Sequence, residues 1–261
     1  MAAGSRKRYW ITGASSGLGR ALTVRLAQQG HDLIVSSRKR EALEALAKDY
    51  PEQIQVLSCD VADDTQMQGL FTNHASGVDT LDGIFLCAGQ CEYIDLPDFN
   101  LSTFKQLMAV NFQGTVNACA AAYPLLQEAV RQGRPRPFIV GLCSMSSYLG
   151  FPRAEAYGAS KAAMAYFLDS LRADIGKDMD VINVYLGFVD TPMTARNDFP
   201  MPFMKSPERT AEAILKKIEK RPHRVNYPWR LHFMLKTFSK LQGIWFHGIV
   251  PRLRRSGELV S

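Results

Sequence analysis

Hydrophobic residues occur along the chain in two alternating patterns. Short runs such as 83–87 and 138–143 are apolar throughout, which is typical of strands buried on both faces of a parallel sheet. Longer stretches such as 20–29 repeat apolar residues at helical spacing until Gly30. This alternation predicts an α/β protein, with a parallel sheet covered by helices on both faces. We expect strands at 8–12, 32–36, 54–58, 83–87, 138–143, 181–185 and 224–228, and helices at 20–29, 40–50, 64–74, 101–131 (broken near 111–114), 155–176 and 206–220.

The pattern becomes irregular after Pro192. Residues 193–204 combine Met, Phe and Pro with few charges and no clear period. They predict a mobile apolar flap at about 192–206 that covers an apolar or aromatic substrate. The alternative is that these side chains pack on the body or on a partner subunit. Ser206, Pro207 and Glu208 then supply an N-cap, a first-turn proline and a first-turn acid, which predicts the start of the next helix.

Length and composition indicate a single globular domain. The chain has 261 residues, of which 46% are hydrophobic and 21% charged. We expect one domain over residues 1–225 and an extension over 226–261. The N-terminal segment has no apolar signal region, and five cysteines without a metal-site spacing favour a reducing compartment. We therefore predict a cytoplasmic protein without a metal, and attachment to the periphery of a membrane is an open alternative.

The net charge of +6 is concentrated near the C-terminus. Residues 216–255 contain 11 Lys and Arg against a single acid, Glu219, so the rest of the chain has a net charge of −4. From Trp229 onward the segment is also amphipathic, because apolar residues recur at helical spacing. These are Leu231, Met234, Leu235, Phe238 and Leu241.

Three interpretations of this extension remain open. It could pack on the body or on a neighbouring subunit, or it could attach to a membrane surface. Lys236 and Lys240 interrupt the apolar run, which argues against a membrane-spanning helix. Nucleic-acid binding is disfavoured because the sequence contains no recognised nucleic-acid-binding module.

A glycine-rich turn follows the first predicted strand and opens the first predicted helix. Such a turn lets a pyrophosphate approach backbone N–H groups at a helix N-terminus, where the helix dipole favours anions. By itself the spacing is also compatible with a simple turn. The candidate cofactor-binding residues in it are Gly13, Ser15, Ser16, Gly17, Leu18 and Gly19.

The end of the second predicted strand indicates which dinucleotide binds. A site that prefers NAD places a carboxylate there, on the ribose 2′-hydroxyl. This chain has Ser37 and Arg38 instead. A guanidinium can bind the 2′-phosphate of NADP in a bidentate manner, so we predict NADP(H) as the cofactor.

A tyrosine and a lysine lie four residues apart on one predicted helix. Tyr157 and Lys161 therefore share a face. An adjacent ammonium lowers the pKa of a phenol, so the pair could act as an acid and base. Ser144 follows a buried strand thirteen residues before the tyrosine, and strand ends are where open α/β sheets build their sites.

In this order the motifs resemble the short-chain dehydrogenases/reductases. The turn TGASSGLG, the YxxxK pair, Ser144 and the Asn of VNFQG (residues 110–114) carry the resemblance, which runs from about residue 7 to 220. It implies a Rossmann-type, doubly wound sheet of about seven strands. It also implies a catalytic tetrad. Tyr157 would transfer the proton, Ser144 would hydrogen-bond the substrate oxygen, Lys161 would bind the nicotinamide ribose, and Asn111 would hold a proton-relay water.

The resemblance implies further cofactor contacts. Asp60 and Val61 would contact the adenine, and Gly187, Val189 and Thr191 would lie near the nicotinamide. Asn111, Tyr157 and Lys161 would contact the cofactor as well. Three segments depart from the family pattern. Leu86-Cys87-Ala88-Gly89 stands where the family usually has Asn-Asn-Ala-Gly, although Cys87, Ala88 and Gly89 would still contact the cofactor. Leu186-Gly187 replaces a usual Pro-Gly, and Gly141 replaces a usual Asn in the fifth strand.

These features predict an oxidoreductase that transfers hydride between NADP(H) and a carbonyl or secondary alcohol of an apolar small molecule, with reduction favoured. The alternative is a non-enzymatic, NADP-binding redox sensor that keeps the fold. The resemblance also implies a homodimer or homotetramer, assembled through the helices that contain residues 111–132 and 157–175.

Overall fold

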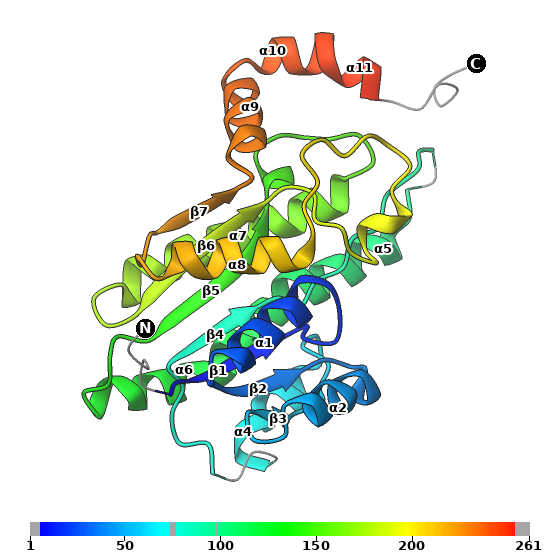
Figure 1. Ribbon diagram of the computed structural model, residues 1–261. Coiled ribbons are helices and arrows are strands. Elements are labelled where there is room, and N and C mark those ends of the chain that lie inside the picture. Colours follow the sequence, from blue (N-terminus) through cyan, green and yellow to red (C-terminus); the bar gives the residue numbers. More distant parts are fainter. Residues whose placement is uncertain (1–5, 74–76, 98, 254–261) are drawn as a thin grey trace.

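The computed structural model describes residues 6–73, 77–97 and 99–253, and Figure 1 shows its elements. Seven parallel strands form one sheet in the order β3-β2-β1-β4-β5-β6-β7, which confirms the predicted Rossmann-type fold. The strands are β1 (Arg8–Thr12), β2 (Asp32–Ser36), β3 (Ile54–Val56), β4 (Gly83–Leu86), β5 (Phe138–Ser144), β6 (Asp180–Leu186) and β7 (Arg224–Tyr227).

Most helices lie where the periodicity predicts them. The expected break near residue 111 is a π-helical turn, η1 (Met108–Gln113), between α5 and α6. The predicted helix 64–74 is interrupted at Gly69, and its last residue lies outside the described residues. The main helices are α1 (Gly17–Gln28), α2 (Arg40–Asp49), α3 (Asp64–Gln68), α4 (Leu70–Asn73), α5 (Leu101–Leu107), α6 (Gly114–Arg131), α7 (Glu155–Ile175) and α8 (Pro207–Ile218).

Alternate residues of each strand enter two different cores. In β1, Trp10 packs with the side of the sheet that α6 and α7 cover, whereas Ile11 packs with the side of α1 and α8. This period of two follows from the pleat of a strand. The unusual glycine at position 141 has a steric reason, because a side chain there would collide with Leu168 and Met164 of α7. Gly141 thus lets the helix that contains Tyr157 lie close to the sheet.

The C-terminal segment leaves the sheet at the carboxyl end of β7 (Figure 1). It forms α9 (Trp229–Lys240), α10 (Gln242–Ile244), a π-helical turn η4 (Trp245–Ile249) and α11 (Val250–Leu253). Its inner side chains are buried, and the indole nitrogen of Trp245 donates a hydrogen bond to the carbonyl of Gly150 over 2.9 Å. These contacts show that one face of the segment packs on the body.

Not every apolar position of the extension is on that inner face. Leu231 and Leu235 are buried and Phe238 is half-buried, whereas Met234 and Leu241 are exposed. Strand β7 crosses the expected boundary at residue 225, and residues 254–261 of the extension lie outside the described residues. The division of the chain at this point stays a prediction. Within the described part, the chain forms no helix with the length and apolar character of a membrane span.

Candidate active site

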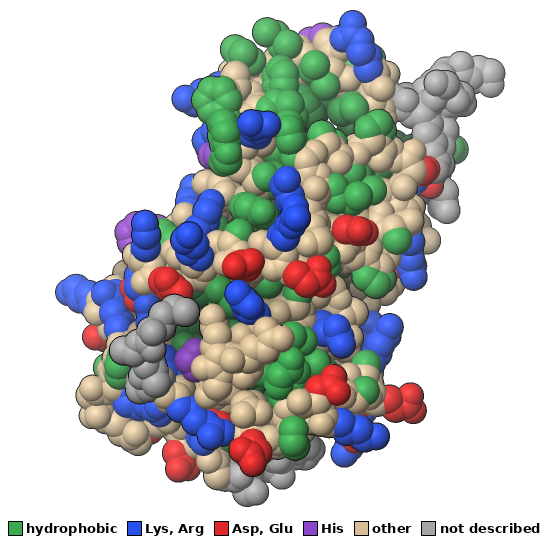
Figure 2. All heavy atoms as spheres, viewed as in Figure 1, with side chains coloured by type: hydrophobic (Ala, Val, Ile, Leu, Met, Phe, Trp, Pro, Cys, Tyr) green, Lys and Arg blue, Asp and Glu red, His purple; other side chains and the backbone are tan. Residues whose placement is uncertain are grey.

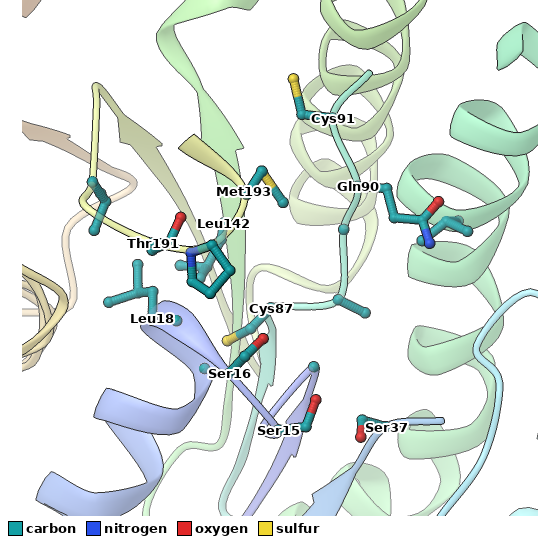
Figure 3. A pocket seen from close by; sticks show the side chains of 18 of the residues that line it. Ser15, Ser16, Leu18, Ser37, Cys87, Gln90, Cys91, Leu142, Thr191 and Met193 are labelled. Atoms are coloured by element: carbon teal, nitrogen blue, oxygen red, sulfur yellow. The ribbon is translucent and has the colours of Figure 1, made fainter. Parts of the chain in front are cut away.

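A cavity of about 520 Å³ lies at the carboxyl ends of the strands, beside the point where the strand order reverses between β1 and β4. Open α/β sheets bind ligands at such a point, because the loops on either side diverge there. Figure 3 shows Ser15, Ser16 and Leu18 from the β1–α1 turn near Cys87, with Thr191 and Met193 beyond them.

The structure brings almost all the candidate residues to this one cavity. Asn111 is the exception, because it is fully buried and does not line the cavity. The candidates that line it are Gly13, Ser15, Ser16, Gly17, Leu18, Gly19, Ser37, Arg38, Asp60, Val61, Cys87, Ala88, Gly89, Ser144, Tyr157, Lys161, Gly187, Val189 and Thr191.

The glycine-rich turn is held against the end of β4. The hydroxyl of Thr12 accepts hydrogen bonds from the backbone nitrogens of Cys87 and Ala88, over 3.1 and 3.2 Å. Gly13 has a φ of +67°, and a Cβ there would lie 2.7 Å from the nitrogen of Ala88. Glycine is therefore required at position 13 both by its backbone conformation and by its close neighbour.

The N-terminus of α1 is open toward the cavity. Ser16 is the N-cap residue, but its side chain makes no capping hydrogen bond, and the first turn contains no acidic residue. Backbone N–H groups in a first helical turn lack partners within the helix, and the helix dipole favours an anion near them. The turn thus offers donors that suit the pyrophosphate of a dinucleotide.

Arg38 lines the end of the cavity that lies beyond β2. Its guanidinium is 3.8 Å from the carboxylate of Asp60, and 58% of its side chain is exposed. Lys39 lines the same end. This end of the cavity is therefore rich in cations, and its single arginine–carboxylate pair leaves most of the guanidinium accessible to a phosphate.

Tyr157 and Ser144 form the polar centre of the other end. Burial raises the pKa of Tyr157 above its ordinary value, and hydrogen bonding with Ser144 only partly opposes this rise. Ser144 also accepts a hydrogen bond from the hydroxyl of Ser146 over 2.9 Å. In the structure Tyr157 is therefore a neutral phenol at physiological pH.

Lys161 does not lower the pKa of Tyr157 as we expected from sequence. Its ammonium is buried and donates a hydrogen bond to the carbonyl of Leu142 over 2.9 Å, and burial lowers its own pKa. The expectation considered charge alone, whereas desolvation of the phenol dominates in this buried site.

Asn111 connects the loop after β4 to α7. Its amide oxygen accepts a hydrogen bond from the backbone nitrogen of Gln90 over 2.8 Å, and its amide nitrogen donates to the carbonyl of Gln90 and to Ser160, each over 2.9 Å. The π-helical turn η1 contains Asn111, and such turns often mark functional sites. Gly89 lies close to both Asn111 and Lys161, because a Cβ at this glycine would be only 3.2 Å from the Asn111 amide oxygen and 3.3 Å from the Lys161 ammonium.

Other cavity residues were not singled out from sequence. Gln90 and Cys91 follow the end of β4, so extending the strand-end rule by two residues would have found them. Burial raises the pKa of the Cys91 thiol to about 11, so this side chain is uncharged where it lines the cavity. Glu92 and Arg196 also line the cavity, so the apolar flap contributes one of its few charged side chains, Arg196, to the cavity wall.

The flap is attached to neighbouring loops. Phe199 packs edge-on against Tyr93 at 5.5 Å between ring centroids, and Asn197 accepts a hydrogen bond from the Tyr93 hydroxyl over 3.0 Å. Arg153 joins three loops, because it pairs with Asp198 of the flap at 2.8 Å and with Asp95. Several flap side chains thus pack on the body, while Met193 faces the cavity.

A parallel sheet with its cavity at the reversal of strand order, beside a glycine turn, defines a Rossmann-type α/β protein. Residues 7–200 match the family model described as short chain dehydrogenase. The chain belongs to this family of oxidoreductases.

Individual proteins agree with this assignment. An uncharacterized oxidoreductase of Myxococcus xanthus is 30% identical over 263 residues, which cover 97% of this chain and 100% of the relative. The fold is similar to that of a short-chain dehydrogenase from Streptomyces avermitilis, with a TM-score of 0.77, 21% identity, and coverage of 93% and 96% of the two chains. It is also similar to a serine dehydrogenase complexed with NADP+, with a TM-score of 0.73, 20% identity, and coverage of 84% and 93%.

Proposed function

We propose that this protein is an NADP(H)-dependent reductase that converts the carbonyl group of an apolar small molecule to an alcohol. The observation that carries the proposal is that one cavity joins the cationic end at Arg38 to the half-buried pair Tyr157 and Ser144. The open N-terminus of α1 lies between these two ends. A cofactor and a carbonyl substrate could therefore occupy the cavity together.

The residues present fit a dinucleotide with a 2′-phosphate. The first turn of α1 would bind the pyrophosphate, and Arg38 with Ser37 would bind the 2′-phosphate. Asp60 and Val61 would contact the adenine, while Thr191 and Val189 would contact the carboxamide. The similar serine dehydrogenase was solved with NADP+, which supports this choice of cofactor. When bound, the cofactor supplies the hydride.

The proton would come from Tyr157. Because burial keeps its phenol neutral, it holds the proton that carbonyl reduction consumes. Ser144 would donate a hydrogen bond to the substrate oxygen. Lys161 would orient the nicotinamide ribose, and Asn111 would position Lys161 and the loop at Gln90.

The substrate end of the cavity favours apolar molecules. Leu142, Met193 and the neutral thiol of Cys91 line it. Arg196 and Glu92 also line the cavity and would contact a polar group of a substrate. We therefore propose an apolar carbonyl compound as the substrate class.

The decisive test is the Tyr157→Phe variant. Wild-type protein should oxidise NADPH in the presence of aromatic aldehydes, ketosteroids or long-chain ketones, as followed by absorbance. The variant should lose at least about 10²-fold in turnover, since positioned proton transfer contributes about 10²- to 10⁴-fold. NADPH affinity, measured by fluorescence titration, should change little. Tyr166→Phe, on the exposed side of the same helix, is the matched control and should retain activity.

Full activity of Tyr157→Phe would contradict the proposed proton donor. A wild-type protein that binds NADPH but reduces no member of the panel would instead support the redox-sensor alternative.

We further propose that the protein is a cytoplasmic homodimer or homotetramer. All five cysteines are free thiols, which fits a reducing compartment. Helices α6 and α7 would form the subunit contacts, as the family resemblance implies.

A further inference from the structure

Helix α9 has two apolar faces, of which the body covers only one. Leu231 and Leu235 are buried against the body, at 3% and 4% exposure. Trp229 and Phe233 are one helical turn apart on the opposite face, and they are 65% and 69% exposed. Exposed aromatic side chains of this size are unusual unless they contact another molecule.

The outer face continues into the helices that follow. We name as the C-terminal patch the exposed apolar side chains of α9 to α11. Figure 2 shows hydrophobic side chains gathered at this end of the molecule, with lysine and arginine side chains around them. The patch consists of Trp229, Phe233, Met234, Leu241, Ile244, Phe246 and Leu253.

The charges around the patch have one sign. Residues 229–253 contain no Asp or Glu, and all four of their Lys and Arg side chains are exposed. Lys240 lies seven residues after Phe233, on the same outward face of α9. Lys236 lies three residues after Phe233 and is exposed, with its ammonium 5.7 Å from the centroid of the Tyr148 ring of the body. Arg230 and Arg252 are the other two.

We propose that the C-terminal patch binds the surface of a lipid bilayer that contains anionic lipids. Exposed aromatic and aliphatic side chains would enter the interface between headgroups and acyl chains, where Trp is favoured. The lysines would contact the lipid phosphates, because their long stems let the ammonium reach the headgroups.

The charge pattern favours a bilayer over a second copy of this chain. Two copies that paired through the patch would place Lys236 and Lys240 opposite cations of their own kind, and no acidic residue of 229–253 could compensate them. An anionic membrane instead supplies both the negative charge and the apolar layer that the patch lacks.

The patch lies at the same edge of the sheet as the cavity. Helix α9 follows the carboxyl end of β7, and a side chain at Gly187, on the cavity wall, would collide with Leu231. Trp245 is hydrogen-bonded to Gly150, in the loop between β5 and α7. Membrane binding would therefore hold the substrate end of the protein near the lipid surface.

Sedimentation with vesicles tests this inference on the full chain. We expect the protein to sediment with vesicles of equal parts phosphatidylcholine and phosphatidylglycerol, and much less with phosphatidylcholine alone. Trp229→Ser combined with Phe233→Ser should abolish sedimentation. Lys236→Gln combined with Lys240→Gln should weaken the vesicle affinity roughly tenfold or more, since each cation near an anionic surface adds to binding.

Two control variants make the test specific. Leu101→Ser removes an apolar side chain that is 64% exposed at the start of α5. Lys216→Gln combined with Lys220→Gln makes the same change of charge at the end of α8, which precedes β7 and so lies at the opposite edge of the sheet. Both controls should sediment with the anionic vesicles as wild type does.

Failure of the wild-type protein to sediment with anionic vesicles would overturn the inference. So would a lower mass of the Trp229→Ser/Phe233→Ser variant in light scattering without vesicles, because the patch would then be a subunit interface. NADPH oxidation with a water-soluble aldehyde should be unchanged in all these variants. Vesicle binding and reductase activity can therefore fail independently.

Discussion

At the scale of single residues, burial determines the chemistry of this site more than charge does. Lys161 is buried and Tyr157 is half-buried, and desolvation shifts the pKa of each group toward its neutral form. A neutral phenol is the proton donor that a reductase needs, whereas an oxidation would need the phenolate. The phenol of Tyr157 is therefore protonated in the free protein, as the proposed carbonyl reduction requires.

Arg38 should determine the choice of cofactor. The Arg38→Asp variant should bind NADPH roughly ten- to a hundredfold more weakly, because it loses a charge-assisted contact of about 1.5–3 kcal/mol and gains a repulsive carboxylate. NADH affinity should remain near its wild-type value. Isothermal titration with both cofactors provides the measurement.

Arg40→Asp is the matched control for Arg38. Arg40 begins α2, pairs with Glu44 at 2.6 Å and does not line the cavity. Its replacement should leave both affinities nearly unchanged. Equal losses for NADPH and NADH in Arg38→Asp would show that this arginine does not discriminate between the two cofactors.

At the scale of elements, the site depends on how closely two loops approach. The β1–α1 turn and the segment after β4 are joined by the hydroxyl of Thr12, and Gly13 contacts the backbone of Ala88. The departure at Cys87 removes an amide side chain that is usual in the family but leaves these backbone contacts in place. The backbone geometry, rather than the side chain at 87, therefore holds the two loops together.

Gly13→Ala should disturb this contact. The new Cβ would need a positive φ and would collide with the backbone at Ala88, so the loop must shift. Gly30 also has a positive φ, of +80°, but has no heavy atom within 4 Å of the position of a Cβ. Gly30→Ala should therefore lower the free energy of unfolding by only about 1–2 kcal/mol, which is the cost of a positive φ at an alanine. Urea denaturation measures this change.

Gly13→Ala should lose more stability than this control and should also bind NADPH more weakly in a titration. If the two variants were equally stable and bound NADPH equally well, the close approach at Ala88 would not support the site.

At the scale of the whole molecule, the charge is divided between two regions. Residues 216–255 have a net charge of +10, although the protein as a whole has only +6. Four of its cations, Arg230, Lys236, Lys240 and Arg252, adjoin the exposed apolar patch of α9 to α11, whereas Lys216 and Lys220 lie at the opposite edge of the sheet. The cations at the cavity are a separate group around Arg38. A high overall pI is therefore compatible with a body that is itself acidic.

The exposed side of α7 should form a subunit contact. Tyr166 is 80% exposed there. In an oligomer assembled through α6 and α7, Tyr166→Asp would bury a charge, so its mass in multi-angle light scattering should fall toward that of a monomer. Tyr166→Phe should keep the wild-type mass. An unchanged mass of the Asp variant, or a monomeric wild type, would contradict this assembly.

Much of the fold could be predicted from sequence because its signals are local. Short runs rich in apolar residues predicted all seven strands within about two residues at either end, and the N-cap at Ser206 is confirmed by its hydrogen bond from the backbone of Arg209. The cavity residues within the motifs were also found, since strand ends and the glycine turn are recognisable without knowledge of packing. Arg196 was missed because the irregular segment that contains it has no period from which its direction could be inferred.

The sequence alone determined the order of strands and helices, the cationic residue after β2, and the amphipathic, basic character of the C-terminal segment. Only the tertiary structure decided which face of α9 is buried. Helical spacing placed Leu231, Leu235 and Met234 in one apolar stripe, but it could not show which of them touch the body. Leu231 and Leu235 are buried, with Leu231 beside Gly187, whereas Met234 stays exposed. The pKa of Tyr157 was decided in the same way, because desolvation depends on atoms distant in sequence that only folding brings together.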